Sequence, residues 1–526
     1  NKEDKKKYII RMEVENGVKQ PQQPSRSPHL KLKNILAQVF ASCSKYLIML
    51  DIGMGISYPT IAIPPLLHEG QGFTITTSEA TWFASLVFIW QPVGSIASVP
   101  LSGLGRKRSM FYLQIPLLIG WILPYFASSA WELYIASSVL GLGIGFMQAP
   151  IATYIGEVCQ PKYRGLLAFI AYCFLTLGSV AVYAIDVICG NWRHTALYCA
   201  SLPPLTAIVL FLIPESPIWL VSKGRYEEAK KSLMWLRGWT DEASIEAEFK
   251  TLVIHNCKRL SAIQNGNLSQ KITCVSDHYN ASYAVTDASP EENQPIEADL
   301  DKDEESNREE KKEMSFIRYF FTKEMYKPLI LSLVFLYLSN GIGVAVFRSY
   351  LVLIFQHFKV EMDEYIATVG VTLIGLIGNI VSVILMPIIG KRKLTFTAII
   401  LCMFGILALA LYSIFGDVNQ TWIPIALMVE IFFATNLGVG HIPWILMSEI
   451  FPLRGRTLAT GIVAGAGNFM QFLGTKLFWT YVEYLTLGGT FIMYFITFCI
   501  GLTYLYFFQV ETEGRTLDEI VATFRK

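Results

Sequence analysis

The sequence predicts an all-α membrane protein in which 12 transmembrane helices form two six-helix bundles, with both termini on the cytoplasmic side. Three observations predict this fold class: the composition, the number of long apolar runs, and three short motifs that recur in the same order in both halves. Hydrophobic residues make up 53% of the 526-residue chain and charged residues only 16%, which is far from the composition of a soluble domain. The formal net charge of +1 gives no basis for binding nucleic acid.

The apolar runs that are long enough to cross a membrane fall into two groups of six. About 20 helical residues are needed to cross about 30 Å of hydrocarbon. The predicted N-terminal bundle, residues 37–213, contains the runs 37–67, 81–101, 110–126, 133–154, 166–189 and 195–213. The predicted C-terminal bundle, residues 326–510, contains the runs 328–355, 368–389, 394–415, 422–447, 458–482 and 491–510.

Polar segments lie before, between and after the two groups. Residues 1–36 and 511–526 are predicted to be cytoplasmic tails, and the first tail lacks the apolar core of a cleavable signal peptide. The linker, residues 214–325, is predicted to begin with a short amphipathic helix because Ala229 and Leu233 recur on one helical face. Its later acidic stretch has few aromatic or β-branched residues and is expected to be disordered.

The orientation follows from the distribution of lysine and arginine in the short loops, since cytoplasmic loops carry an excess of both. The loops after the second, fourth, eighth and tenth runs are basic, and they contain Arg106, Lys107, Arg108, Lys162, Arg164, Lys391, Arg392, Lys393, Arg454 and Arg456. The opposite loops and the helix ends beside them carry only Arg193, Arg348, Lys359 and Lys476. The basic side, together with the linker and both tails, is therefore predicted to face the cytoplasm.

Three glycosylation sequons bear on this orientation. Asn267 and Asn280 fall in the linker and are expected to stay unmodified, whereas Asn419 falls in a loop on the opposite side. Asn419 is therefore a possible glycosylation site.

Three motifs occur once in each half and in the same order. A glycine followed by basic residues ends the second and eighth runs, an acid-proline-arginine-glycine pattern ends the fourth and tenth, and a glutamate follows the sixth and twelfth. The paired positions are Gly105 and Gly390, Glu157 and Glu449, and Glu215 and Glu511, which are 285, 292 and 296 residues apart. Repeated six-helix halves are typical of transporters that bind their substrate near the membrane midplane, between the repeats.

These motifs resemble those of the sugar porter family of the major facilitator superfamily, and most closely its arthropod facilitated trehalose transporters. The resemblance extends over roughly residues 37–520. It is carried by Gly105-Arg106-Lys107 and by the segments EVCQPKYRG (157–165), PESPIWL (214–220), IPWILMSEIFPLRGR (442–456) and ETEGRTLDEI (511–520). It implies a monomeric plasma-membrane protein that moves a sugar, trehalose or a hexose, by alternating access.

The resemblance also implies a charged latch at the cytoplasmic mouth. Half-wet ion pairs of this kind are strong enough to hold two surfaces together and weak enough to break. The residues predicted to form it are Arg106, Glu157, Arg164, Glu215, Arg392, Glu449, Arg454 and Glu511. Ser102 and Pro387 stand where the family usually has aspartate, so we expect part of this latch to be weakened. The alternative is that the basic residues only set the orientation.

A sugar-binding cavity is implied as well, in which amides and hydroxyls match the sugar hydroxyl groups and an aromatic ring stacks on the sugar ring. The positions that correspond to the family's binding residues are Tyr172, Ser339, Asn340, Trp444 and Asn468. On the seventh helix a shift in register would place Tyr337 and Leu338 there instead. Each of these residues could alternatively be a packing residue, or an interhelical hydrogen-bonding group.

Asp51 lies inside the first apolar run, with no lysine or arginine one turn further on. A carboxylate within the membrane is a functional-site hypothesis by default. Proton-coupled members of the resembled family have an aspartate in a similar setting, which makes Asp51 a possible proton site. The alternative is a structural acid that pairs with a neighbouring helix.

The sequence contains no P-loop, HExxH or GxSxG motif, and its nine cysteines lack the spacing of a metal site. We therefore expect a transporter that needs no cofactor, rather than an enzyme. Passive sugar transport is the favoured function. The alternatives are a proton-coupled symporter, a transporter of a non-sugar solute, and a nutrient sensor that does not transport.

Overall fold

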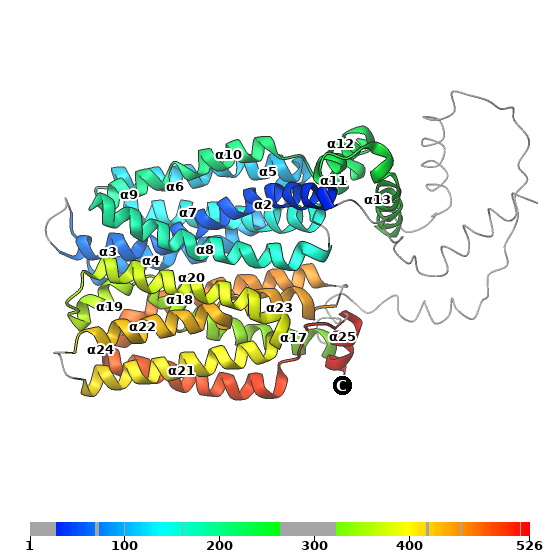
Figure 1. The fold of residues 1–526 in the computed structure, drawn as a ribbon. Coiled ribbons are helices and arrows are strands. Elements are labelled where there is room, and N and C mark those ends of the chain that lie inside the picture. Colours follow the sequence, from blue (N-terminus) through cyan, green and yellow to red (C-terminus); the bar gives the residue numbers. More distant parts are fainter. Residues whose placement is uncertain are drawn as a thin grey trace, which may run out of the picture.

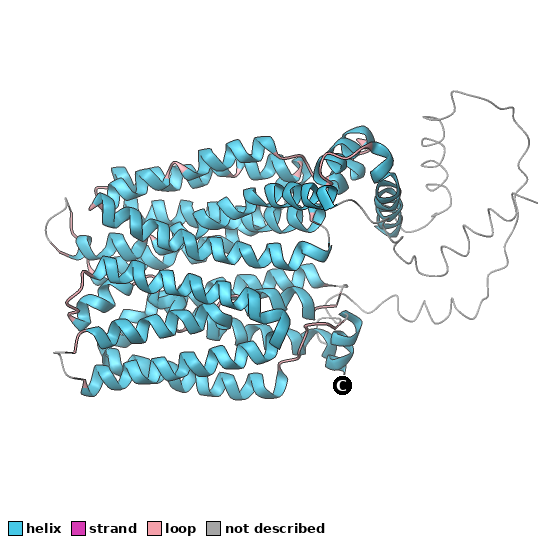
Figure 2. Cartoon of the chain, in the orientation of Figure 1, coloured by secondary structure: helices cyan, strands magenta, loops and turns pink. Residues whose placement is uncertain are grey.

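The computed structural model describes residues 28–68, 73–98, 100–159, 161–263, 322–416, 420–452, 455–515 and 517–525. These residues form helices joined by short turns, without a β-strand in any of the described ranges (Figure 2). Two helical bundles lie side by side, one built from the first half of the chain and one from the second (Figure 1).

The N-terminal bundle contains six spans, of which three are interrupted for one or two residues and continue in nearly the same direction. Its helices are α2 (Pro28–Ser57), α3 (Pro59–Leu67), α4 (Thr77–Ala97), α5 (Arg106–Tyr112), α6 (Gln114–Phe126), α7 (Ala130–Val158), α8 (Pro161–Cys189), α9 (Trp192–Cys199) and α10 (Leu202–Leu212), with a 3-10 turn at Pro100–Leu104. The pairs α2 with α3, α5 with α6, and α9 with α10 each make one span.

The C-terminal bundle has two spans that change helix type at mid-membrane. Its elements are α17 (Lys323–Leu336), the π-helix η2 (Tyr337–Gly341), α18 (Val344–Phe347), α19 (Leu351–Phe358), α20 (Glu364–Ile389), α21 (Lys391–Phe415), α22 (Trp422–Ala434), the π-helix η3 (Thr435–Val439), α23 (Ile442–Ile450) and α24 (Arg456–Phe508). Such π-turns occur frequently at functional sites.

Ten helices among the described residues are long and apolar enough to cross a membrane, and two features bring this number to 12. The 53 residues of α24 would extend about 80 Å as one rod, far more than a membrane is thick. The backbone breaks at Thr486, where φ is 65°, so α24 comprises two antiparallel spans. The remaining span is the interrupted series α17, η2, α18 and α19. The predicted fold class of two six-helix bundles is confirmed.

Small residues bring the helices of each bundle into close contact. A Cβ atom added to Gly141 or Gly145 of α7 would overlap the carbonyl oxygens of Val87 and Gln91 on α4. The glycine-rich stretch of α7 is therefore a packing face, as is common between membrane helices.

The linker adds helices at one end of the N-terminal bundle: α11 (Pro217–Ser222), α12 (Tyr226–Leu236) and α13 (Glu242–Ile263). Ala229 and Leu233 are buried in a small core of their own, so the predicted amphipathic helix is present as α12. At the same end, α25 (Leu517–Arg525) lies next to α17 at the end of the C-terminal bundle (Figure 1). We call this the linker end and the opposite one the far end. The acidic stretch predicted to be disordered lies outside the described residues.

Candidate transport site

A cavity of about 950 Å³ lies between the two bundles. Its lining begins near the far end with Arg348 and continues to Ser95, Thr153 and Leu458. These last three residues lie at the linker end, in the final turns of α4 and α7 and the first turn of α24. The cavity therefore extends from the middle of the protein to the linker end.

Polar contacts between the bundles close the cavity at the far end. The hydroxyl groups of Thr60 and Tyr183 both donate to the carbonyl oxygen of Arg348, the latter over 3.0 Å. Lys476 Nζ donates to Thr81 Oγ1 over 2.8 Å and lies 4.3 Å from the centre of the Trp82 ring. The structure is thus closed at the far end and open toward the linker end.

A buried hydrogen-bond network joins the bundles near the middle. Asn379 Nδ2 of α20 donates to Thr176 Oγ1 of α8 over 2.7 Å and to Asn436 Oδ1 of η3 over 3.2 Å. Thr176 Oγ1 also lies 3.4 Å from Asn436 Oδ1. All three residues line the cavity, and Asn436 is held in place by donation to Phe432 O over 2.8 Å.

The five residues that the sequence suggested for substrate binding all line this cavity: Tyr172, Ser339, Asn340, Trp444 and Asn468. The amide Nδ2 of Asn340 is buried and has no hydrogen-bond partner among the described residues. The alternative register on the seventh helix does not fit the cavity. Tyr337 is 42% exposed and Leu338 lies where a Cβ atom on Gly501 would meet it, and neither lines the cavity.

Several further polar residues line the cavity and were not named as binding residues from the sequence: Gln91, Gln148, Thr176, Asn379, Asn436, His441 and Gln471. The signal that could have found most of them is an amide inside an apolar run, because such a group is costly in lipid unless it is paired or faces water. His441 Nε2 lies 3.0 Å from Ser382 Oγ, and its ring centre lies 5.9 Å from that of Tyr172 on the opposite bundle.

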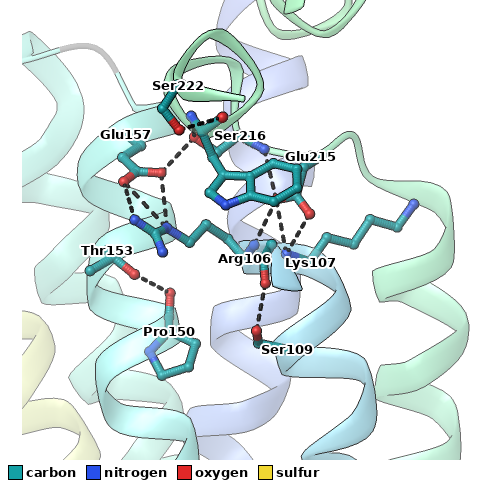
Figure 3. Close-up of polar contacts among 11 residues, drawn as sticks. Arg106, Lys107, Ser109, Pro150, Thr153, Glu157, Glu215, Ser216 and Ser222 are labelled. Atoms are coloured by element: carbon teal, nitrogen blue, oxygen red, sulfur yellow. Dashed lines mark hydrogen bonds and ion pairs between the residues drawn. The ribbon is translucent and has the colours of Figure 1, made fainter. Parts of the chain in front are cut away.

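In the N-terminal bundle, the predicted latch residues form a compact cluster at the linker end (Figure 3). Arg106 Nη2 lies 3.0 Å from Glu157 Oε1. Glu215 Oε1 accepts the backbone N–H groups of Arg106 and Lys107 over 2.9 and 3.0 Å. The Ser216 hydroxyl donates to Glu157 Oε2 over 2.5 Å. The start of α5 is thereby tied to the ends of α7 and α10.

The C-terminal bundle repeats this cluster with different side chains. Lys391 Nζ lies 2.7 Å from Glu449 Oε1 and 3.0 Å from Glu513 Oε2. Glu511 accepts the backbone N–H groups of Lys391 and Arg392 over 3.1 and 2.9 Å. The side chain of Arg392 instead donates to Tyr506 O over 2.7 Å. The sequence suggested that Arg392 forms the ion pair with Glu449. Lys391 forms it instead, because Lys391 is the first residue of α21, just as Arg106 is the first residue of α5.

Glycine is required in front of both clusters. Gly105 has a φ of 119° and Gly390 a φ of 83°, which are values that other residues rarely adopt. A Cβ atom at either position would also press on the capping carboxylate of Glu215 or Glu511.

Some predicted residues lie outside what the structure describes. They are Arg454, the side chain of Arg164, and the sequon asparagines Asn267, Asn280 and Asn419. Their predicted roles in the latch and in glycosylation stay predictions.

Asp51 lies in α2 and is 1% exposed. The indole Nε1 of Trp121 donates to its Oδ1 over 2.6 Å, whereas Oδ2 has no hydrogen-bond partner in the described part of the chain. Asp51 does not line the cavity, although Met49 and Ile52 beside it do. It therefore faces its own bundle rather than the central cavity.

Comparison with known proteins agrees with this geometry. The family model for sugar (and other) transporters matches residues 36–273 and 275–524. The chain belongs to the sugar transporter family. It is 26% identical to the facilitated trehalose transporter Tret1 of Polypedilum vanderplanki, over 99% of this chain and 94% of that protein. It is also 26% identical to Tret1 of Bombyx mori, over 90% of this chain and 83% of that protein.

The same fold is found in solved structures of this transporter type. A partially occluded inward open conformation of the xylose transporter XylE from E. coli has a TM-score of 0.66 at 15% identity, covering 90% of this chain and 100% of XylE. XylE bound to 6-bromo-6-deoxy-D-glucose, described as a major facilitator superfamily proton:xylose symporter, has a TM-score of 0.64 at 16% identity, covering 94% and 99%. As a member of the sugar transporter family, the protein is a transporter and not an enzyme.

Proposed function

We propose that the protein carries a sugar across the membrane by alternating access, without coupling to protons. The observation that carries this proposal is the 950 Å³ cavity, which is closed at the far end by contacts between the bundles and extends to the linker end. Its size falls at the upper end of the roughly 300–1,000 Å³ typical of small-molecule sites. The relatives that are named as trehalose transporters support a sugar, and trehalose or a hexose are the substrates to test.

The cavity lining supports a ligand with many hydroxyl groups. Asn340, Asn379, Asn436, Asn468 and Gln471 present amides from four spans of the C-terminal bundle. An amide both donates and accepts, so it can bind a hydroxyl group in either role. Trp444 adds an aromatic face to the same cavity, on which the C–H groups of a sugar ring can stack.

The charged clusters at the linker end serve the conformational change in this proposal. Each ties the ends of several spans in its own bundle through Glu215 or Glu511, which keeps that bundle rigid. When the far end opens, the clusters around Arg106 and Lys391 approach each other and form the latch, together with Arg164 and Arg454. Rocking of one repeat against the other around a central site is the usual transport cycle of such folds.

Passive transport is favoured over proton coupling by the place of Asp51. No carboxylate of the described residues lines the cavity. Asp51 does not line it because its carboxylate faces Trp121 within the N-terminal bundle. The excess of lysine and arginine at the linker end supports a cytoplasmic location for that end and for both tails, in a plasma-membrane protein that works as a monomer.

Uptake measurements in oocytes test the proposal. Labelled trehalose, glucose and a panel of non-sugar solutes are compared in cells in which the protein is shown to reach the surface. We expect at least one sugar to equilibrate down its gradient and to exchange with the same sugar on the other side. If no sugar enters above the level of water-injected cells, the proposed substrate class is wrong.

A further inference from the structure

The central cavity contains one cation with no matching anion. Arg348 is the only ionic side chain among the described residues that line the cavity. It lies between α18 and α19 of the C-terminal bundle, close to the contacts that close the far end. An arginine stays protonated at any physiological pH, so the cavity has a fixed positive charge at its closed end.

The guanidinium of Arg348 is not neutralised within the described part of the protein. Its Nε is buried and has no hydrogen-bond partner, and none of the ion pairs found there includes Arg348. Asp186 of α8 accepts from Thr195 Oγ1 over 2.9 Å and forms no ion pair with Arg348 in the described part of the protein. Buried charges are expensive unless they are paired, and this one is exposed to the space in which the substrate binds.

The backbone of Arg348 is fixed on both sides. Its carbonyl oxygen accepts from Thr60 and Tyr183 of the other bundle, and two residues later Tyr350 donates to Thr475 O over 2.9 Å. These contacts fix the backbone from which the Arg348 side chain extends, and the guanidinium carries a planar fork of N–H donors that fits a carboxylate or phosphate group well.

We propose that the transported solute carries one anionic group, a carboxylate or a phosphate, which binds Arg348 at the closed end of the cavity. The amides of Asn340, Asn379, Asn436 and Asn468 bind the hydroxyl groups of the same solute nearer the middle. This inference rests on the proposed function. It narrows the proposed substrate class from sugars in general to polyhydroxylated solutes that carry one anionic group.

The test compares uptake of four labelled solutes by the full-length protein in proteoliposomes: glucuronate, glucose 6-phosphate, glucose and trehalose. Glucuronate and glucose 6-phosphate distinguish the two possible anionic groups. The variants are Arg348→Gln, Arg348→Lys and, as a matched control, Arg193→Gln. Arg193 is a second far-end arginine that lies outside the cavity, over the ring of Trp192. Thermal unfolding of each purified variant confirms that it is folded.

We expect the wild-type protein to take up at least one of the two anions faster than glucose or trehalose. Arg348→Gln should raise the KM for that anion by about tenfold or more, as expected for the loss of one charge-assisted hydrogen-bonded pair. The KM for a neutral sugar should rise by a smaller factor than the KM for the anion. Arg348→Lys should keep part of the preference because it retains the charge, and Arg193→Gln should leave it unchanged.

Other outcomes overturn the inference. If a neutral sugar is transported and neither anion competes with it, the solute is neutral and the proposed function stands while this inference fails. If Arg348→Gln is folded and slows neutral and anionic solutes alike, Arg348 serves the closure of the far end and not recognition. If none of the four solutes enters, the proposed function fails as well.

Discussion

The two bundles share one scaffold but contribute unequally to the cavity. At the linker end their clusters correspond: Arg106 and Lys391 pair with Glu157 and Glu449, Glu215 and Glu511 cap the starts of α5 and α21, and Ser216 and Thr512 donate to the paired glutamate. In the cavity, most of the polar side chains and the tryptophan come from the C-terminal bundle. Both halves therefore share the framework, whereas the polar lining of the cavity, which we propose recognises the substrate, is concentrated in one half.

The two clusters also differ in charge. Among the ion pairs of the described residues, Arg106 pairs with Glu157, whereas Lys391 lies between Glu449 and Glu513 and its side chain is only 8% exposed. Removal of Lys391 breaks two of these ion pairs, and removal of Arg106 breaks one. The C-terminal cluster should therefore be the more sensitive to loss of its cation.

The largest expected effect follows from this asymmetry. Lys391→Gln should lower the free energy of unfolding by about 3 kcal/mol, because breaking a buried pair from one side typically costs 3–5 kcal/mol. Arg106→Gln should cost about 1–2 kcal/mol, since the Arg106 side chain is more exposed than that of Lys391 and its removal affects one ion pair of the described residues rather than two. Thermal unfolding in detergent measures both variants. Equal losses of unfolding free energy in the two variants would show that the pair between Lys391 and Glu513 does not add to stability.

A second prediction addresses the unequal cavity. Trp444→Ala should raise the KM for uptake roughly 30-fold, since a central aromatic residue in a binding site is commonly worth about 2 kcal/mol. Tyr172→Phe, in the opposite bundle, should change the KM by less than about threefold because it keeps the ring. Unchanged kinetics for Trp444→Ala at normal surface expression would remove Trp444 from the binding site.

A smaller effect is expected when the cations are exchanged between the clusters. Arg106→Lys loses the planar fork that contacts Glu157 through Nε and Nη2, and should cost about 1 kcal/mol of stability. Lys391→Arg must place a larger head group between two acids in a tighter site, and should cost about as much. The double exchange should be close to additive because the pairs lie in different bundles. Strong coupling between them would indicate contact across the linker end.

No effect on coupling is expected from Asp51→Asn. Because Asp51 faces Trp121 and not the cavity, sugar uptake should not accelerate at acidic external pH in the wild type, and the variant should show the same pH profile. Uptake at external pH 5.5 and 7.5, values chosen to span about two pH units, measures this. Acid-stimulated uptake that disappears in Asp51→Asn would establish proton coupling instead.

The sequence predicted the helices and their repetition well because both depend on local properties. The length of each apolar run sets a span, and the motif spacing identifies the repeat. The amphipathic helix around Ala229 and Leu233 was likewise evident from its periodicity. What was not evident depends on tertiary packing. The π-turn that places Ser339 and Asn340 in the cavity cannot be read from composition.

Side-chain register was the other source of error. The sequence suggested Arg392 for the latch, although the 285-residue spacing of Gly105 and Gly390 places Lys391 opposite Arg106, and Lys391 is the residue that begins the helix capped by Glu511. The direction in which the Asp51 side chain points also depends on how α2 is rotated about its axis relative to the neighbouring helices. Amides such as Asn379 and Asn436 could have been found by applying to them the argument that was used for Asn340.

The network of Thr176, Asn379 and Asn436 lies where the two bundles touch near mid-membrane. If the bundles rotate as rigid bodies about an axis through this network, the atoms of the network move less than those at either end. Its hydrogen bonds can then persist throughout the transport cycle while the contacts at the two ends break and form. Hydrogen bonds that are present in both end states favour neither of them, so the network keeps the bundles aligned without shifting the equilibrium between the two states.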